Sequence, residues 1–109
     1  MREMLEDLIR KFNSKAASDP ALRAELEGLT KTVLIELRDG QAYHFTLKDA
    51  HVAGLLDGRT DPADITISTD PATLTALIRR EIGPFKAYAT GKIRLKGSLE
   101  DLARFRKFF

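Results

Sequence analysis

In the second half of the chain, the alternation of apolar and polar positions predicts a strand followed by a helix. Residues 63–69 alternate with period two, so Ile65 and Ile67 share one face of a half-buried strand. Asp70 supplies a side-chain cap and Pro71 a preset backbone angle, which together predict a helix start. The apolar stripe of this helix is Leu74, Leu77 and Ile78.

After this helix, the sequence predicts a break, a short aromatic helix and another strand. Gly83-Pro84 marks the break, because proline disfavours helical geometry in the residue before it. Residues 92–96 then alternate as a strand, with Ile93 and Leu95 on one face. The short helix between them carries two rings, Phe85 and Tyr88.

A last amphipathic helix is predicted from residue 98 onwards. Ser98 begins a capping-box-like start, in which Asp101 stands where Glu or Gln is more usual. The apolar side of this helix consists of Leu99, Leu102, Phe105 and Phe108 or Phe109.

The first 29 residues predict two amphipathic helices. Apolar residues at helical spacing indicate a helix over about residues 2–14, which we expect to end at Asn13-Ser14. Ser18 or Asp19, together with Pro20, then predicts the start of a second helix.

Two strands joined by a tight turn follow, and then a weaker third strand. Residues 32–38 alternate, and Asp39-Gly40 is the sequence signal of a type I′ hairpin turn. The third strand is expected around residues 51–56, where the pattern leaves the inward face open. The inward residues of the first two strands are Val33, Ile35, Leu37, Tyr43, Phe45 and Leu47.

These elements predict a single α+β domain over residues 1–109. Residues 1–29 hold the N-terminal helices, and residues 30–109 hold a five-stranded mixed sheet and the C-terminal helices. We expect the helices to gather on one face of the sheet, because short helices need a sheet on which to pack.

Composition narrows the class of protein. With 109 residues and 43% hydrophobic content the chain can bury one core. It has no cysteine, which excludes disulfides and thiolate metal sites. No apolar run approaches the roughly 20 residues of a membrane span, so we expect a soluble, cytoplasmic protein.

Charge is unevenly distributed along the chain. The net charge is only +2, but residues 79–109 contain nine basic and three acidic side chains. One hypothesis is that this basic part docks on anionic membrane headgroups, and the alternative is an ordinary solvated surface. Nucleic acid is not expected as a partner, because no helix-turn-helix, RNP or zinc motif is present. The candidate docking residues are Lys92, Arg94, Lys96, Arg104, Arg106 and Lys107.

Residues 83–97 carry a resemblance to a known family. The run Gly-Pro-Phe-Lys-Ala-Tyr-Ala-Thr-Gly-Lys-Ile-Arg-Leu-Lys-Gly resembles the signature of the sterol carrier protein 2 (SCP2) family, the non-specific lipid-transfer proteins. In that family, the residue at the position of Gly83 is usually Asn. The resemblance extends back to about Thr32 and implies an SCP2-like fold with an apolar tunnel between the sheet and the C-terminal helices.

Apolar stripes at regular spacing, taken alone, are more often a packed core than a cavity. The resemblance implies instead that the inward residues line a lipid tunnel. The lipid-binding residues expected on this basis are Ile35, Leu37, Phe45, Ile65, Ile67, Leu74, Leu77, Ile78, Phe85, Tyr88, Ile93, Leu95, Leu102 and Phe105.

The function expected from this resemblance is lipid binding and transfer without catalysis. Expected ligands are a fatty acid, a fatty acyl-CoA, a sterol-like molecule or an isoprenoid, held by burial of apolar surface. The alternative is an accessory or interaction domain of a lipid- or isoprenoid-modifying assembly, with no ligand of its own.

Catalytic residues, a metal site and a cofactor are not expected. His44 and His51 are the only histidines, and they lack the spacing of metal ligands. None of the serines has the Gly-x-Ser-x-Gly context of a nucleophile elbow.

Overall fold

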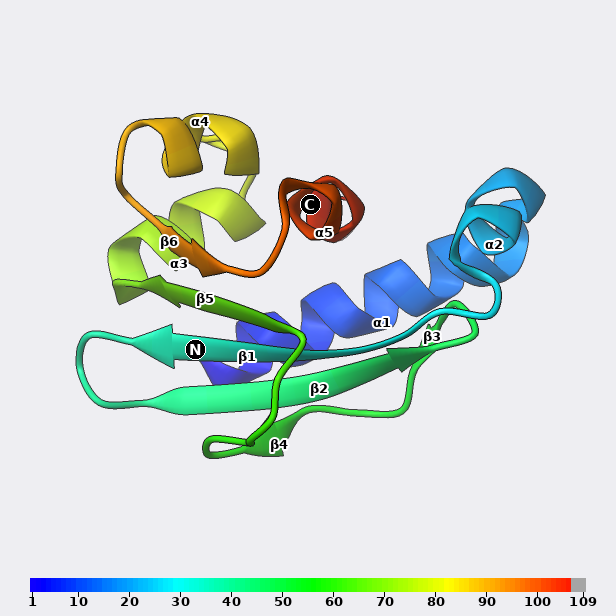
Figure 1. Ribbon diagram of the computed structural model, residues 1–109, viewed down its shortest axis with the longest axis horizontal. Helices are drawn as coiled ribbons and strands as arrows, with labels where there is room; N and C mark the ends of the chain where they lie inside the picture. The colour runs from blue at the N-terminus through cyan, green and yellow to red at the C-terminus, as the bar shows by residue number, and fades with distance from the viewer. Residues whose placement is uncertain (107–109) are drawn as a thin grey trace.

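The computed structural model describes residues 1–106, except for the side chain of Phe105. Its helices and strands are shown in Figure 1. In chain order they are α1 (Arg2–Ser18), α2 (Pro20–Leu26), β1 (Thr30–Leu37), β2 (Ala42–Lys48), β3 (His51–Val52), β4 (Leu56–Asp57), β5 (Ile65–Thr69), α3 (Pro71–Ile78), α4 (Pro84–Ala89), β6 (Arg94–Lys96) and α5 (Leu99–Phe105).

The strands form one mixed sheet in the order β3-β2-β1-β5-β6, with β4 also paired to β2. β1 and β5 are parallel and the other pairs are antiparallel. The expected α+β class is confirmed, although the described residues give six strands rather than five. The additional strand arises because the segment predicted as one strand at residues 51–56 forms two short strands, β3 and β4. Val52 is the inward residue of β3, with 1% of its surface exposed.

The first helix is longer than expected and continues to Ser18. Asn13 does not end it, because the Asn13 side chain bonds the backbone of β3 rather than that of its own helix. Ala16 extends the buried stripe by one more turn. Asp19 then caps α2 as expected, since its Oδ1 accepts from the amides of Ala21 and Leu22 at 3.1 Å each.

The turn between β1 and β2 is a three-residue loop, not the expected type I′ turn. The Gly40 amide donates to the Leu37 carbonyl at 3.0 Å, and of the two residues in the predicted turn only Gly40 has a positive φ. This is the pattern of a type I turn followed by a glycine bulge. Two-residue type I′ geometry occurs instead between β2 and β3, where both Asp49 and Ala50 have positive φ.

Packing against the sheet is confined largely to one face. In Figure 1 the C-terminal helices lie together on one side of the sheet. The inward residues of β1, β2 and β5 share a single buried cluster with residues of α1, α2, α3 and α5. Leu34 is also buried, with 4% exposed, but it belongs to the opposite face and lies outside this cluster. The loop around residues 59–63 lies beside it.

Candidate functional site

The space between the sheet and the C-terminal helices brings together most of the predicted lipid-binding residues. Ile78 and Leu95 are partly buried against this core. The Phe105 side chain lies outside the described residues. Those that are buried in the core are Ile35, Leu37, Phe45, Ile65, Ile67, Leu74, Leu77, Ile93 and Leu102. The expected inward face of the sheet is therefore present, and these residues pack as one cluster.

An apolar pocket of about 200 Å³ opens where α3 connects to α4. Leu77, which is 1% exposed, lines it, so the pocket reaches the core. The connection forms a recess because α3 ends at Ile78 and Arg80 adopts a φ of +61° before α4 begins. The remaining lining residues are Arg80, Ile82, Gly83 and Pro84.

Three larger pockets have more polar walls, and the smallest of these, of about 270 Å³, includes Arg23, Asp49 and His51 in its lining. One of about 510 Å³ lies on the helix-free face of the sheet, where Arg59 and Glu36 form an ion pair at 2.7 Å. Another of about 380 Å³ lies between α1 and the β3–β4 segment and includes Arg2, Glu6 and Arg10 in its lining. Charged walls disfavour an acyl chain. Of these four pockets, the recess beside Leu77 is therefore the best candidate for an apolar ligand.

The short helix α4 has an unexpected orientation. Its small residues Pro84 and Ala87 are buried, whereas Phe85 and Tyr88 are each 40% exposed and lie outside the core cluster. The expectation that both rings face inward is thus corrected. Ala87 is 0% exposed, so this position has no room for a large side chain, and its carbonyl accepts from the Lys92 amide at 2.8 Å.

Among residues 1–106, the predicted docking cations do not form one surface. Arg94 and Lys96 alternate with the inward Leu95, so they lie on the helix-free face of β6. Arg104 pairs with Glu100 at 2.7 Å and with Asp101 at 3.0 Å. Lys107 lies outside the described residues. The two remaining cations, Lys92 and Arg106, are exposed on other parts of the surface.

The guanidinium of Arg106 lies over the ring of Phe85, with 5.7 Å from its carbon to the ring centroid. This geometry is that of a cation–π contact. It joins the end of α5 to the outer side of α4.

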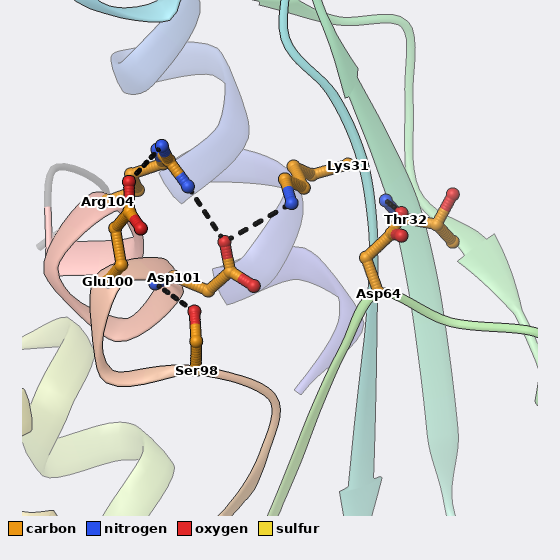
Figure 2. Close-up of polar contacts among 7 residues, drawn as sticks. All are labelled: Lys31, Thr32, Asp64, Ser98, Glu100, Asp101 and Arg104. Atoms are coloured by element: carbon orange, nitrogen blue, oxygen red, sulfur yellow. Dashed lines mark hydrogen bonds and ion pairs between the residues drawn. The ribbon is translucent and has the colours of Figure 1, made fainter.

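A buried carboxylate anchors the start of α5, as Figure 2 shows. Asp101 is 7% exposed, and its Oδ1 lies 3.4 Å from Lys31 Nζ and 3.0 Å from the Arg104 guanidinium. The expected Ser98 cap is confirmed, since its hydroxyl accepts from the Asp101 amide at 3.0 Å. The Asp101 side chain reaches β1, not back to Ser98 as in a full capping box.

Both histidines lie on strands of the sheet. His44 bonds the carbonyl of Gly58 through Nδ1 at 2.9 Å, and His51 is exposed on β3. Within residues 1–106 there is no group of three His, Cys, Asp or Glu side chains that could hold a metal ion. The same residues contain no helix long and apolar enough to cross a bilayer.

Two solved structures that this chain covers over most of their length have a similar fold. A solution structure of a possible sterol carrier protein from Thermus thermophilus matches with a TM-score of 0.71 at 21% identity, covering 99% of this chain and 80% of the other. Palmitated SCP2L2 from Aedes aegypti matches with a TM-score of 0.62 at 19% identity, covering 94% of this chain and 90% of the other.

A much larger enzyme contains a similar unit. The sec-alkylsulfatase Pisa1 from Pseudomonas sp. matches with a TM-score of 0.67 at 21% identity, covering 80% of this chain but only 14% of the enzyme. This chain therefore spans a small part of that protein.

Comparison with protein-family models assigns the chain to a family. A search of curated proteins found no match. The model of the SCP-2 sterol transfer family matches residues 9–109, which is nearly the whole chain. The chain therefore belongs to the SCP-2 sterol transfer family.

Proposed function

We propose that this domain binds a single apolar lipid chain, such as a fatty acid, in the recess beside Leu77 and transfers it between membranes without catalysing a reaction. The family match over residues 9–109 carries this proposal. The apolar recess that reaches the core between α3 and α4 supports its location.

Burial of apolar surface supplies the binding free energy. Each methylene removed from water contributes about 0.8 kcal/mol, so a long acyl chain is held without a specific hydrogen bond. A site that works in this way tolerates ligands of different headgroup and length. Arg80 at the rim offers a cation to a carboxylate headgroup while the chain enters beside Leu77.

The recess must enlarge to hold a whole ligand. Its volume of about 200 Å³ is below the roughly 300–1,000 Å³ of ordinary ligand sites. The helix α4 is the element best suited to move, because it is short and joins α3 through an exposed connection at Arg79, Arg80 and Glu81. Binding is therefore expected to displace α4 while the sheet stays in place.

Two glycines allow a matched test of this location. A Cβ added at Gly83 or at Gly54 has no atom within 4 Å, and neither glycine has a positive φ. Gly83 lines the α3–α4 recess, whereas Gly54 lines the larger pocket beside α1. Either position therefore accepts a leucine without a clash, so Gly83→Leu should narrow the proposed site and Gly54→Leu should narrow the other pocket with the same side chain.

The experiment measures palmitate affinity by isothermal titration for the delipidated wild type and both variants. We expect Gly83→Leu to lower affinity by about tenfold or more and Gly54→Leu to leave it unchanged. If Gly54→Leu is the variant that loses binding, the site lies beside α1. Failure of the wild type to bind palmitate, together with no lipid in solvent extracts of the purified protein, would support an accessory domain without a ligand.

A further inference from the structure

The helix α4 presents its large rings to solvent and its small residues to the protein. Phe85 and Tyr88 are three residues apart and so lie on one side of the helix. The buried residues Pro84 and Ala87 have the same spacing, about 100° around the helix from the two rings. In Figure 1, α4 lies farther from the sheet than α3 does. Two neighbouring aromatic side chains are thus exposed at the edge of the helical layer.

Three exposed cations lie on α4 or close to it. Lys86 lies on α4, Lys92 follows it, and Arg106 lies over the Phe85 ring. Residues 82–99 contain no Asp or Glu. Within the described part of the chain, none of these three cations forms an ion pair with a carboxylate. The rings and the cations together form an aromatic, positively charged surface, here called the α4 surface.

The chemistry of the α4 surface identifies its partner. Aromatic rings sit at the level of the lipid headgroups, and Lys and Arg side chains are attracted to anionic lipids. A second copy of this chain fits less well, because pairing two α4 surfaces would bring like charges together. We propose that the α4 surface docks on an anionic lipid bilayer, with Phe85 and Tyr88 at the headgroup level.

This proposal rests on the proposed lipid transfer and extends it. Gly83 and Pro84 line the recess beside Leu77 and directly precede the Phe85 ring in the chain. A ligand would therefore pass between bilayer and recess at the docked surface. Arg94 and Lys96 take no part, because they lie on the helix-free face of β6.

The chain contains no tryptophan, so a single introduced indole reports on its own position. Tyr88→Trp places the probe on the α4 surface. Leu56→Trp places it on β4, where the native leucine is 59% exposed. Emission is recorded with vesicles of phosphatidylcholine, with and without phosphatidylserine, at low and high salt.

We expect the emission of Tyr88→Trp to shift to shorter wavelength with phosphatidylserine vesicles, and the shift to disappear at high salt. Leu56→Trp should not shift. No shift for Tyr88→Trp, or an equal shift for both probes, would overturn the proposal. A shift that grows with protein concentration in the absence of lipid would assign the surface to a second copy of the chain.

Charge neutralisation separates docking from ligand binding. In the Tyr88→Trp background, Lys86→Gln should weaken vesicle binding by about fivefold, whereas Lys96→Gln on β6 should not change it. Palmitate binding in solution should be unaffected by Lys86→Gln in the otherwise native protein. Equal weakening by both substitutions would overturn the assignment to α4. Vesicle binding by a protein that binds no palmitate would support docking and contradict the proposed ligand site.

Discussion

The Asn13 side chain on α1 makes both hydrogen bonds that a neighbouring strand would make with Val52 on β3. Asn13 Nδ2 donates to the Val52 carbonyl at 2.8 Å, and Asn13 Oδ1 accepts from the Val52 amide at 2.9 Å. The two-residue strand β3 is at the edge of the sheet, so these backbone groups have no strand partner on that side. A helix side chain thus completes the edge of the sheet.

Removal of this amide should destabilise the protein. We expect Asn13→Ala to lower the free energy of unfolding by about 1–3 kcal/mol, because the Val52 amide and carbonyl lose their partners. Asn13→Asp should be at least as harmful, since it places a carboxylate oxygen against the Val52 carbonyl. Urea unfolding midpoints measure both effects. Ser14→Ala at the neighbouring exposed position is the control, and a native midpoint for Asn13→Ala would contradict this account.

The Asp101 carboxylate gives a second prediction about stability. It is buried against Lys31 and Arg104, each with 27% of its side chain exposed. We expect Asp101→Ala to cost about 1–3 kcal/mol, since two partly buried cations lose their partner. Glu100→Ala removes a carboxylate that is 73% exposed and should cost less than about 1 kcal/mol. Urea unfolding of both variants checks this, and equal losses would show that burial of the carboxylate has no effect.

The Asp70 cap of α3 predicts a dependence on pH. Hydrogen bonds from the Thr73 amide at 2.7 Å and the Thr73 hydroxyl at 2.9 Å hold the pKa of Asp70 below its ordinary value. Because the folded-state pKa is lowered, the stabilisation is fully present above the unfolded pKa of about 3.9 and is lost as the pH falls through the folded pKa.

Asp70→Asn tests this prediction, because asparagine caps a helix about as well but does not titrate. The wild type should be more stable than this variant at neutral pH and should lose that advantage as the pH falls below about 4. Thermal unfolding over this pH range provides the measurement. The control is Glu81→Gln, which changes an exposed carboxylate without an ion pair in the described residues. A constant difference at every pH would refute the linkage.

The sequence predicted the starts of helices correctly where the capping residue lies next to the helix in the chain. The Asp70-Pro71 start of α3, the Asp19-Pro20 start of α2 and the Ser98 start of α5 are all found in the structure. Each depends on hydrogen bonds within three residues, so the sequence nearby contains the necessary information.

Features set by distant contacts were not predictable in this way. The sequence around Asn13 predicts a helix end there, but the Asn13 side chain forms hydrogen bonds with a strand residue 39 positions away. The type I′ turn at Asp49-Ala50 lacks the usual glycine. It is held from outside by a hydrogen bond from the Gly28 amide to Asp49 Oδ1 at 3.0 Å. Tertiary contacts decide both cases.

In the candidate site, too, some features follow from the local sequence and others do not. Leu74 and Leu77 are buried as their spacing predicts. The exposure of Phe85 and Tyr88 could not be predicted, because a six-residue helix is too short for its spacing to show which side faces the core. For the Lys31–Asp101 pair a weak signal exists, namely the aspartate where a capping box usually has Glu or Gln.

The two buried leucines of α3 provide a test of the recess by stability alone. Both are 1% exposed, but only Leu77 lines the recess. Without ligand, Leu74→Ala should cost about 2–5 kcal/mol, as for a fully packed leucine. Leu77→Ala should cost less, because one side of this residue already lacks packing partners.

If the recess is the lipid site, palmitate should change the relative stabilities of the wild type and the two leucine variants. A bound chain packs against Leu77, so the ligand should stabilise the wild type more than Leu77→Ala. Its stabilisation of Leu74→Ala should match that of the wild type. Urea midpoints with and without palmitate measure all three proteins. If palmitate stabilises the three proteins equally, the chain does not bind beside Leu77, and equal costs for the two substitutions without ligand would show that the recess is too small to affect packing.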